Sequence, residues 1–222
     1  MSDTTNQIDM YNRYDRTIKK LLLLAGLWPV VKPSVFYRLV PYVHLSAELW
    51  LIWAILNFAH LHMKNFELLL KGLGLGLGFL ISAQKIICLT IHRDRLLDLR
   101  TSLGLTFSRD LQDPELRPIL LSPLLTYYRA SLIFSIIAST LCTLYLITPI
   151  ILIIIQLIHG ANVINCILPF TAAYPWSIGP TNKWFFTILY IYEIYVGTCV
   201  ACVAASVDAL FGYYIFQIAG QL

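Results

Sequence analysis

Five ionisable side chains lie within the long apolar stretches of this sequence and are its first candidates for chemistry. They are Glu48, Lys71, Lys85, Glu193 and Asp208. A charged group at the centre of a bilayer costs about 2.5–3.5 kcal/mol, so each must face protein or water. Lys71 and Lys85 lie near the two ends of one apolar stretch, where a lysine can extend its ammonium group to the membrane surface.

Glu193 lies well inside its apolar stretch. It comes nine residues after Trp184, which corresponds to about 13 Å along a helix axis. We expect its carboxyl group to bind a ligand, to pair with a neighbouring helix, or to be protonated in a polar cavity.

His44 and Glu48 are four residues apart and share one face of a helix. They predict a local polar patch and not a metal site, because no third histidine or acid is placed to join them. Cys199 and Cys202 match C-x-x-C, but the absence of a surrounding polar loop favours small apolar packing residues. The sequence has no nucleophile-elbow, zinc-protease or Walker motif. We therefore expect a protein that is not an enzyme and that holds no metal ion or cofactor.

Four glycines alternate with apolar residues at positions 72, 74, 76 and 78. A dinucleotide site would need G-x-G-x-x-G between a strand and a helix, but position 77 is a leucine within an apolar run. The glycines instead form two overlapping G-x-x-x-G pairs, which let a second helix approach closely. They also weaken a helix by up to ~1 kcal/mol each relative to alanine.

Membrane-spanning helices must position these side chains. Of the 222 residues, 58% are hydrophobic and 13% are charged, and the mean hydropathy is +0.72. Soluble domains carry about 25% charged residues, and disordered chains are polar and highly charged. The composition therefore excludes both classes and predicts an all-α, polytopic membrane protein.

Four apolar runs are long enough to cross a bilayer as helices. They cover residues 39–61, 66–91, 127–158 and 184–214. None alternates with period two, which argues against a transmembrane β-barrel. We expect a transmembrane domain over 39–222 and an N-terminal segment over 1–38. In that segment the apolar run 21–31 is predicted to form an interfacial helix, and not a signal peptide, because three aspartates precede it.

The distribution of Lys and Arg predicts the orientation in the membrane. Six lie in the N-terminal segment and six in the connection between the second and third runs, against two or three in the other connections. We expect a cytoplasmic N-terminus and, after four crossings, a cytoplasmic C-terminus. The net charge of +4 is attributed to this orientation and not to an acidic partner such as nucleic acid.

Several short segments follow one another in a specific order. They are Leu24-Ala-Gly-Leu-Trp-Pro29, Leu168-Pro-Phe170 with Tyr174-Pro-Trp176, Tyr190-Ile-Tyr-Glu193, and Asp208-Ala-Leu-Phe211 followed by Gln217 and Gln221-Leu222. Together they resemble the N-terminal signature, the outer loop and the fourth helix of the insect odorant receptor family. The resemblance covers about residues 20–222, with Glu193 at a place where the family usually carries Gln.

The resemblance implies a seven-helix, ligand-gated cation channel of the plasma membrane. Such a receptor binds a small volatile odorant and assembles with the odorant-receptor co-receptor as a hetero-tetramer. The sequence contains four of the seven helices and ends directly after the fourth run, so we expect either the N-terminal part of a longer receptor or a truncated seven-helix receptor that lacks the pore helix. Two alternatives stay open, a gustatory-type chemoreceptor of the same topology and a complete four-helix membrane scaffold.

In the family, the odorant pocket lies in the outer half of the membrane. Such a pocket needs aromatic walls and a few hydrogen-bonding groups. Residues of these types at that depth are Phe79, Ser82, Tyr145, Thr148, Phe186, Tyr190 and Glu193. Ordinary packing between helices is the alternative for each of them. Glu193 in place of Gln predicts a preference for ligands with a hydrogen-bond donor or a positive charge.

Overall fold

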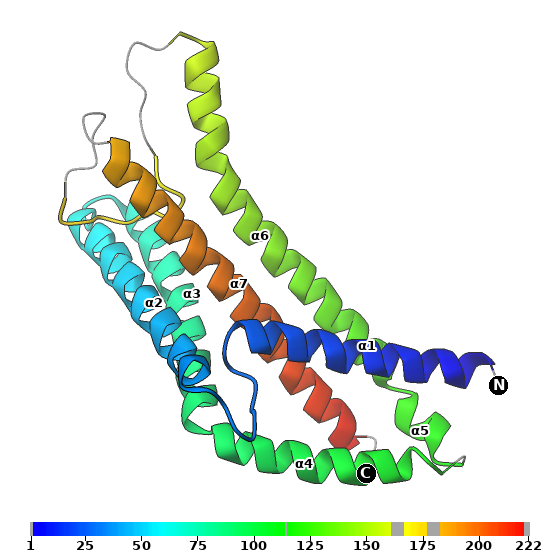
Figure 1. The fold of residues 1–222 in the computed structure, drawn as a ribbon. Coiled ribbons are helices and arrows are strands. Elements are labelled where there is room, and N and C mark those ends of the chain that lie inside the picture. The colour runs from blue at the N-terminus through cyan, green and yellow to red at the C-terminus, as the bar shows by residue number, and fades with distance from the viewer. Residues whose placement is uncertain (1, 114, 161–166, 177–182, 220–222) are drawn as a thin grey trace. The chain divides into compact units, whose positions relative to one another are not determined.

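The computed structural model describes residues 2–113, 115–160, 167–176 and 183–219. Every regular element in these residues is an α-helix, which confirms the predicted all-α fold. Figure 1 shows the helices α1 (Ser2–Leu24), α2 (Val35–Leu61), α3 (Phe66–Ile91), α4 (Arg93–Asp110), α5 (Arg117–Leu121), α6 (Leu124–Ile158) and α7 (Lys183–Ala219).

Four helices of the described chain are long and apolar enough to cross a membrane, as predicted: α2, α3, α6 and α7. The bounds of α3 coincide with the predicted residues 66–91. α2 begins four residues earlier than predicted, at Val35. The reason is a cap: the Tyr37 N–H donates to the Ser34 hydroxyl oxygen over 3.2 Å and satisfies a free amide of the first turn.

The chain divides into two compact units. The first unit contains residues 1–41, 85–138 and 202–222, and the second contains residues 42–84 and 139–201. Each of the four candidate spans is divided between the two units, with one part in each. The two units are described separately below.

In the first unit, the N-terminal helix lies upstream of its predicted position. We predicted an interfacial helix over residues 21–31, but α1 covers Ser2–Leu24 and residues 25–31 are not helical. Gly26 stops the helix because it adopts a left-handed conformation with φ of 71°. The amides of Leu27 and Trp28 then both donate to the Leu22 carbonyl oxygen, over 2.9 and 3.2 Å.

The polar composition of residues 2–20 concealed an apolar stripe on α1. Tyr14, Ile18 and Leu22 recur every four residues, and all three are buried. Tyr14 donates to the Ala209 carbonyl oxygen of α7 over 2.9 Å. α7 continues to Ala219 instead of the predicted residue 214, and in this added part the Gln217 side-chain amide donates to the Tyr11 hydroxyl of α1 over 3.2 Å.

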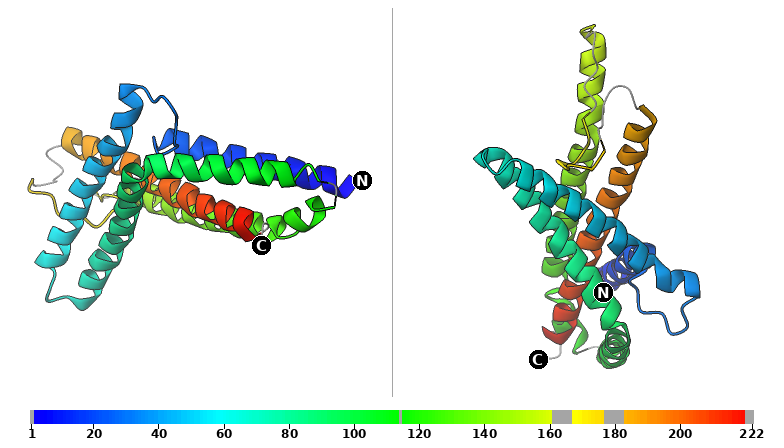
Figure 2. Two further views of the ribbon diagram at one scale, coloured as in Figure 1. Left: turned by 90° about the horizontal axis from the view of Figure 1, so that it is seen from below. Right: turned by 90° about the vertical axis from the view of Figure 1, so that its left-hand side faces the viewer.

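The connection between the second and third spans is mostly helical. It forms α4 and α5, and side chains of α4 meet those of α1: the Tyr11 and Phe107 rings stack at 5.3 Å, and Arg100 lies 4.0 Å from Asp15. The two pairs show that α1 and α4 run in opposite directions, as Figure 2 (left) also shows. Arg100 additionally lies over the Trp28 ring at 4.0 Å.

In the second unit, the core includes a segment that is not helical. Its buried apolar cluster comprises Leu51, Ile52, Ala54, Ile55, Phe79, Ala83, Phe170, Tyr174, Leu189 and Val196. Phe170 and Tyr174 belong to residues 167–176, which we call the loop segment. The connection between α6 and α7 therefore supplies part of the core.

One of the two predicted glycine pairs forms a close helix contact. A Cβ atom on Gly72 would lie 3.1 Å from the Ala59 Cβ atom of α2, and one on Gly76 would lie 3.6 Å from Ile55. Gly74 and Gly78 have nothing within 4 Å. The small-residue face that the spacing predicted is therefore formed by Gly72 and Gly76 alone.

Candidate ligand-binding site

The loop segment is held against α2 through its backbone. The Ala173 N–H donates to the Ala54 carbonyl oxygen over 2.9 Å, and the Asn57 side-chain amide donates to the Ala173 carbonyl oxygen over 3.0 Å. Prolines at positions 169 and 175 keep the segment out of a helical conformation. Its backbone polar groups must therefore find partners outside their own segment. α2 supplies the partners of the Ala173 N–H and carbonyl oxygen. Figure 1 shows the loop segment in yellow between α2 and α7.

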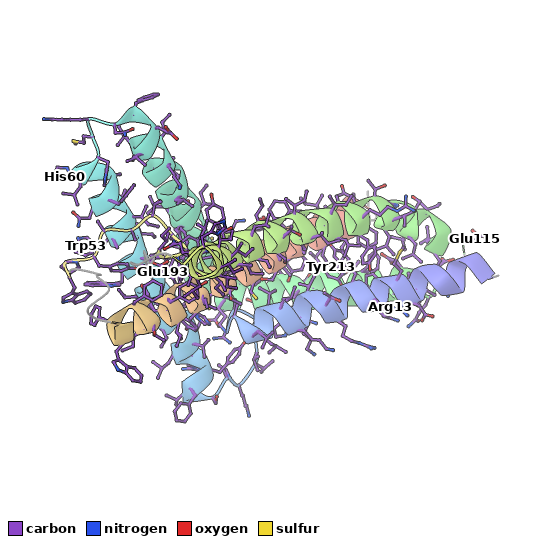
Figure 3. The ribbon with its side chains drawn as sticks, turned by 90° about the horizontal axis from the view of Figure 1, so that it is seen from above. Arg13, Trp53, His60, Glu115, Glu193 and Tyr213 are labelled. Atoms are coloured by element: carbon purple, nitrogen blue, oxygen red, sulfur yellow. The ribbon has the colours of Figure 1, made fainter. Side chains whose placement is uncertain are left out.

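Glu193 holds the same segment from α7. Its side chain is 0% exposed. The Phe170 N–H donates to Glu193 Oε2 over 2.9 Å, and the Tyr174 hydroxyl donates to Oε1 over 2.8 Å. Glu193 is labelled on α7 in Figure 3. Both oxygens thus bond to the loop segment of the same chain, a role that the alternatives drawn from the sequence did not include.

The Phe170 ring brings two predicted site residues together. It packs edge-on against Phe79 of α3, with ring centroids 5.1 Å apart, and stacks with Tyr145 of α6 at 6.0 Å. A Cβ atom on Gly197 of α7 would lie 3.0 Å from the tip of the ring. The absence of a side chain at position 197 therefore makes room for Phe170 beside α7.

A cavity of about 380 Å³ lies between α6 and the loop segment. Its walls are mainly apolar residues, among them Leu144, Leu152 and Leu168, and α3 contributes Lys71. The volume falls within the range of sites for small molecules, which are about 300–1,000 Å³ and mostly apolar.

Thr171 is the most informative polar residue of this cavity. Its hydroxyl oxygen is buried and has no hydrogen-bond partner in the described structure. Leaving such a group unpaired costs about 1–3 kcal/mol. In contrast, the hydroxyl of Thr148, also in the wall, donates to the Leu144 carbonyl oxygen over 2.6 Å.

The predicted site residues lie in three environments. Tyr145 and Thr148 line the cavity. Phe79 and Ser82 are buried in the second unit, where the Ser82 side chain meets the Glu48 carboxyl group of α2.

Phe186, Tyr190 and Glu193 lie on α7 beside other parts of the second unit. The Phe186 and Tyr190 rings are 5.7 Å apart, and the Tyr190 hydroxyl donates to the Leu146 carbonyl oxygen of α6. Sequence reasoning did not select Lys71 or Thr171 for the cavity. Thr171 could have been selected from the sequence, since it follows directly after the Leu168-Pro-Phe170 motif.

His44 bonds across to α7 in the second unit. Its Nδ1 atom lies 2.7 Å from the Tyr195 hydroxyl and 3.2 Å from the Cys199 sulfur. Glu48, one turn further along α2, is buried, and its carboxyl group meets the Ser82 side chain of α3. Among the described residues, no group of three His, Cys, Asp or Glu side chains is placed to hold a metal ion.

In the first unit, Lys85 does not extend to the membrane surface as predicted. Its ammonium group forms an ion pair of 2.6 Å with Asp208 of α7. The pair removes the need for either charge to face lipid. A lysine of α3 and an acid of α7 thereby satisfy each other within the protein.

Comparison with known protein families gives one match. Residues 65–222 match the family model described as 7tm Odorant receptor. The matched region includes α3 to α7, the loop segment and the cavity. Neither the curated proteins nor the solved structures contain a match to the chain.

Proposed function

Since the chain belongs to the seven-transmembrane odorant receptor family, we propose that it is an odorant receptor subunit that binds a small volatile molecule in the cavity beside α6. The family gives it a chemoreceptor role in a multi-pass membrane protein. The family match also favours this function over a gustatory-type receptor and over a membrane scaffold. The observation that carries the proposal is the buried, unpartnered hydroxyl of Thr171 in a largely apolar cavity.

The cavity suits a mostly apolar ligand that has one polar group. The α6 wall offers apolar contact and the Tyr145 ring, while Thr171 offers a hydroxyl that can donate or accept. A carbonyl or hydroxyl group on the ligand would satisfy Thr171. The remainder of the ligand would exclude water from the apolar wall.

Glu193 contributes to this site through the loop segment. Its carboxyl group holds Phe170 and Tyr174, and the neighbouring residues Pro169 and Thr171 line the cavity. We therefore assign Glu193 to the positioning of the cavity wall. The predicted preference for donor or cationic ligands requires direct contact with the carboxyl group, whose two oxygens are already bonded to the loop segment.

The proposal extends to assembly and orientation. We propose that the subunit resides in the plasma membrane with a cytoplasmic N-terminus, and that it gates a cation channel together with the odorant-receptor co-receptor. The twelve Lys and Arg residues of the N-terminal segment, the α3–α6 connection and the start of α6 support the orientation.

The test is a binding measurement on the purified chain in lipid nanodiscs. A panel of volatile alcohols, ketones and hydrocarbons of matched size is titrated while intrinsic fluorescence is followed. Thr171→Val should weaken the binding of alcohols and ketones about three- to tenfold, since one hydrogen bond contributes about 0.5–1.5 kcal/mol, and should leave hydrocarbons unchanged.

Ile151→Ala is the matched control, because Ile151 lies on α6 and is 49% exposed outside the cavity wall. It should bind like the wild type. Equal affinity of Thr171→Val and the wild type for every alcohol and ketone would contradict the site.

A further inference from the structure

We propose that Cys199 is a covalent acceptor site for α,β-unsaturated aldehydes and ketones, with His44 as the base that activates its thiol. The site lies in the second unit, and the cavity described above is lined by other residues. The inference therefore goes beyond the proposed function and can hold or fail independently of it.

The geometry is that of a nucleophile beside a base, with a second donor on the same nitrogen of that base. The Cys199 sulfur lies 3.2 Å from His44 Nδ1, and the Tyr195 hydroxyl lies 2.7 Å from the same nitrogen. The His44 and Tyr195 rings are 5.5 Å apart at their centroids. Tyr195 and Cys199 are one helical turn apart on α7, so both face the same histidine of α2. A thiol within hydrogen-bond reach of a histidine nitrogen is the arrangement of an activated nucleophile, and the Tyr195 hydroxyl competes with the Cys199 thiol for that nitrogen.

The site is accessible to molecules that dissolve in lipid. Cys199 is half-buried and Tyr195 is 38% exposed. Both flanking helices are candidate membrane spans, α2 over Val35–Leu61 and α7 over Trp184–Ala219. Volatile unsaturated carbonyl compounds partition into lipid, and their soft β-carbon matches a soft sulfur nucleophile. This combination sets the ligand class.

The reaction is an addition that needs no other reactant. With its ring hydrogen on Nε2, His44 takes the thiol proton of Cys199 at Nδ1. The sulfur forms a bond to the β-carbon of the ligand, and the carbon–carbon π electrons move towards the carbonyl oxygen to give an enolate. The imidazolium returns the proton to the α-carbon. The product is a thioether with a saturated carbonyl chain, and His44 is regenerated.

Two other cysteines of the chain serve as internal references. The Cys142 thiol donates to the Gly197 carbonyl oxygen over 3.2 Å. Cys88 is exposed on α3. The rate of modification at Cys199 relative to these two thiols separates activation by His44 from simple access of the reagent.

The experiment treats the full chain in nanodiscs with trans-2-hexenal and follows adducts at each cysteine by peptide mass spectrometry. Saturated hexanal is the reagent control. We expect the hexenal adduct to form at Cys199 at least about tenfold faster than at Cys142, since a positioned base accelerates by about 10²–10⁴. Hexanal should give no stable thioether at any cysteine.

Two variants complete the test. His44→Gln should lower the Cys199 rate about tenfold and leave the Cys88 rate unchanged, with helical circular dichroism as the check of folding. Tyr195→Phe keeps the ring and removes a group that competes for Nδ1, so the Cys199 rate should be equal or higher. A Cys199 rate in the wild type no greater than that of Cys142, or a His44→Gln rate equal to the wild type in folded protein, would overturn the proposal. A Tyr195→Phe rate well below the wild type would also overturn it.

Discussion

At the scale of single residues, Glu193 shows how a buried acid in a membrane protein can serve the fold. A carboxyl group accepts hydrogen bonds at both oxygens, and here both acceptors meet donors of the loop segment. The Phe170 backbone amide lies outside any helix and therefore has no intrahelical hydrogen-bond partner. The Tyr174 hydroxyl belongs to a buried ring. The acid therefore satisfies two groups that would otherwise be buried and unpaired.

This role predicts different outcomes for two substitutions of Glu193. Glu193→Ala leaves the Phe170 amide and the Tyr174 hydroxyl unpaired and should lower the free energy of unfolding by about 2–6 kcal/mol, since each unpaired group costs about 1–3 kcal/mol. Glu193→Gln keeps one acceptor and adds a donor, so it should cost less than about 1 kcal/mol. Thermal unfolding in detergent measures both. Faster hydrogen exchange at Phe170 should accompany the alanine variant, and equal exchange in both variants would exclude the anchoring role.

At the scale of elements, α1 is held to the first unit by tyrosine hydroxyl groups. Tyr11 pairs with the Tyr213 hydroxyl at 2.7 Å, and Gln217 donates to Tyr11 over 3.2 Å. Tyr14 pairs with Ser131 at 2.7 Å. Figure 3 labels Tyr213 on α7 at this contact. The partners lie on α6 and α7, so α1 is bound to two membrane-spanning helices.

The α1 contact predicts sensitivity to alkali. Burial raises the pKa of Tyr11 and of Tyr14 above the usual value of 10. Because the folded state favours the protonated form, this stabilisation is present below pH 10 and is lost as the pH rises above it. We expect the protection factors of the α1 amides, which are exchange rates corrected for the intrinsic base-catalysed rate, to fall as the pH rises above 10. A Tyr11→Phe, Tyr14→Phe double variant should lose this pH dependence. If the variant keeps the pH dependence, the titrating groups are not these two tyrosines but others, such as lysines.

The contact of α3 with α2 predicts opposite effects for two neighbouring glycines. Gly72→Leu places a side chain where even a Cβ atom would lie 3.1 Å from Ala59, so it should separate the helices and lower the unfolding temperature in detergent. Gly74→Leu is the matched control. It has open space around it and replaces a weak helix former with a strong one, so it should be neutral or stabilising. Equal losses in both variants would show that the close contact of Gly72 with Ala59 is not what the substitution disturbs.

At the scale of the whole molecule, the charge distribution predicts which ends of the helices face the cytoplasm. The N-terminal segment, the α3–α6 connection and the start of α6 together carry twelve of the 16 Lys and Arg residues. An epitope tag at the N-terminus should label only in permeabilised cells, because positively charged flanks are retained inside. A tag inserted between Lys64 and Asn65, in the α2–α3 connection, should label intact cells. The reverse pattern would invert the orientation.

Much of the architecture follows from local properties of the sequence. Apolar length and charge distribution predicted four helices, and the bounds of α3 agree because the composition changes sharply at both of its ends. The N-terminal helix was predicted at the wrong residues because the prediction followed the continuous apolar run. The helix instead buries Tyr14, Ile18 and Leu22, which recur every four residues within a polar segment and form no continuous run.

The sequence by itself determined the class of the protein, since crossing a bilayer requires about 20 consecutive apolar residues and each such run is visible in the chain. It also marked the Leu168 to Trp176 motif and Glu193 as unusual. Only the tertiary structure decided that these two belong together, and that Thr171 is left unpaired beside a cavity. The physical reason is that hydropathy depends on neighbours along the chain, whereas hydrogen-bond partners depend on which distant segments packing brings within 3 Å of each other.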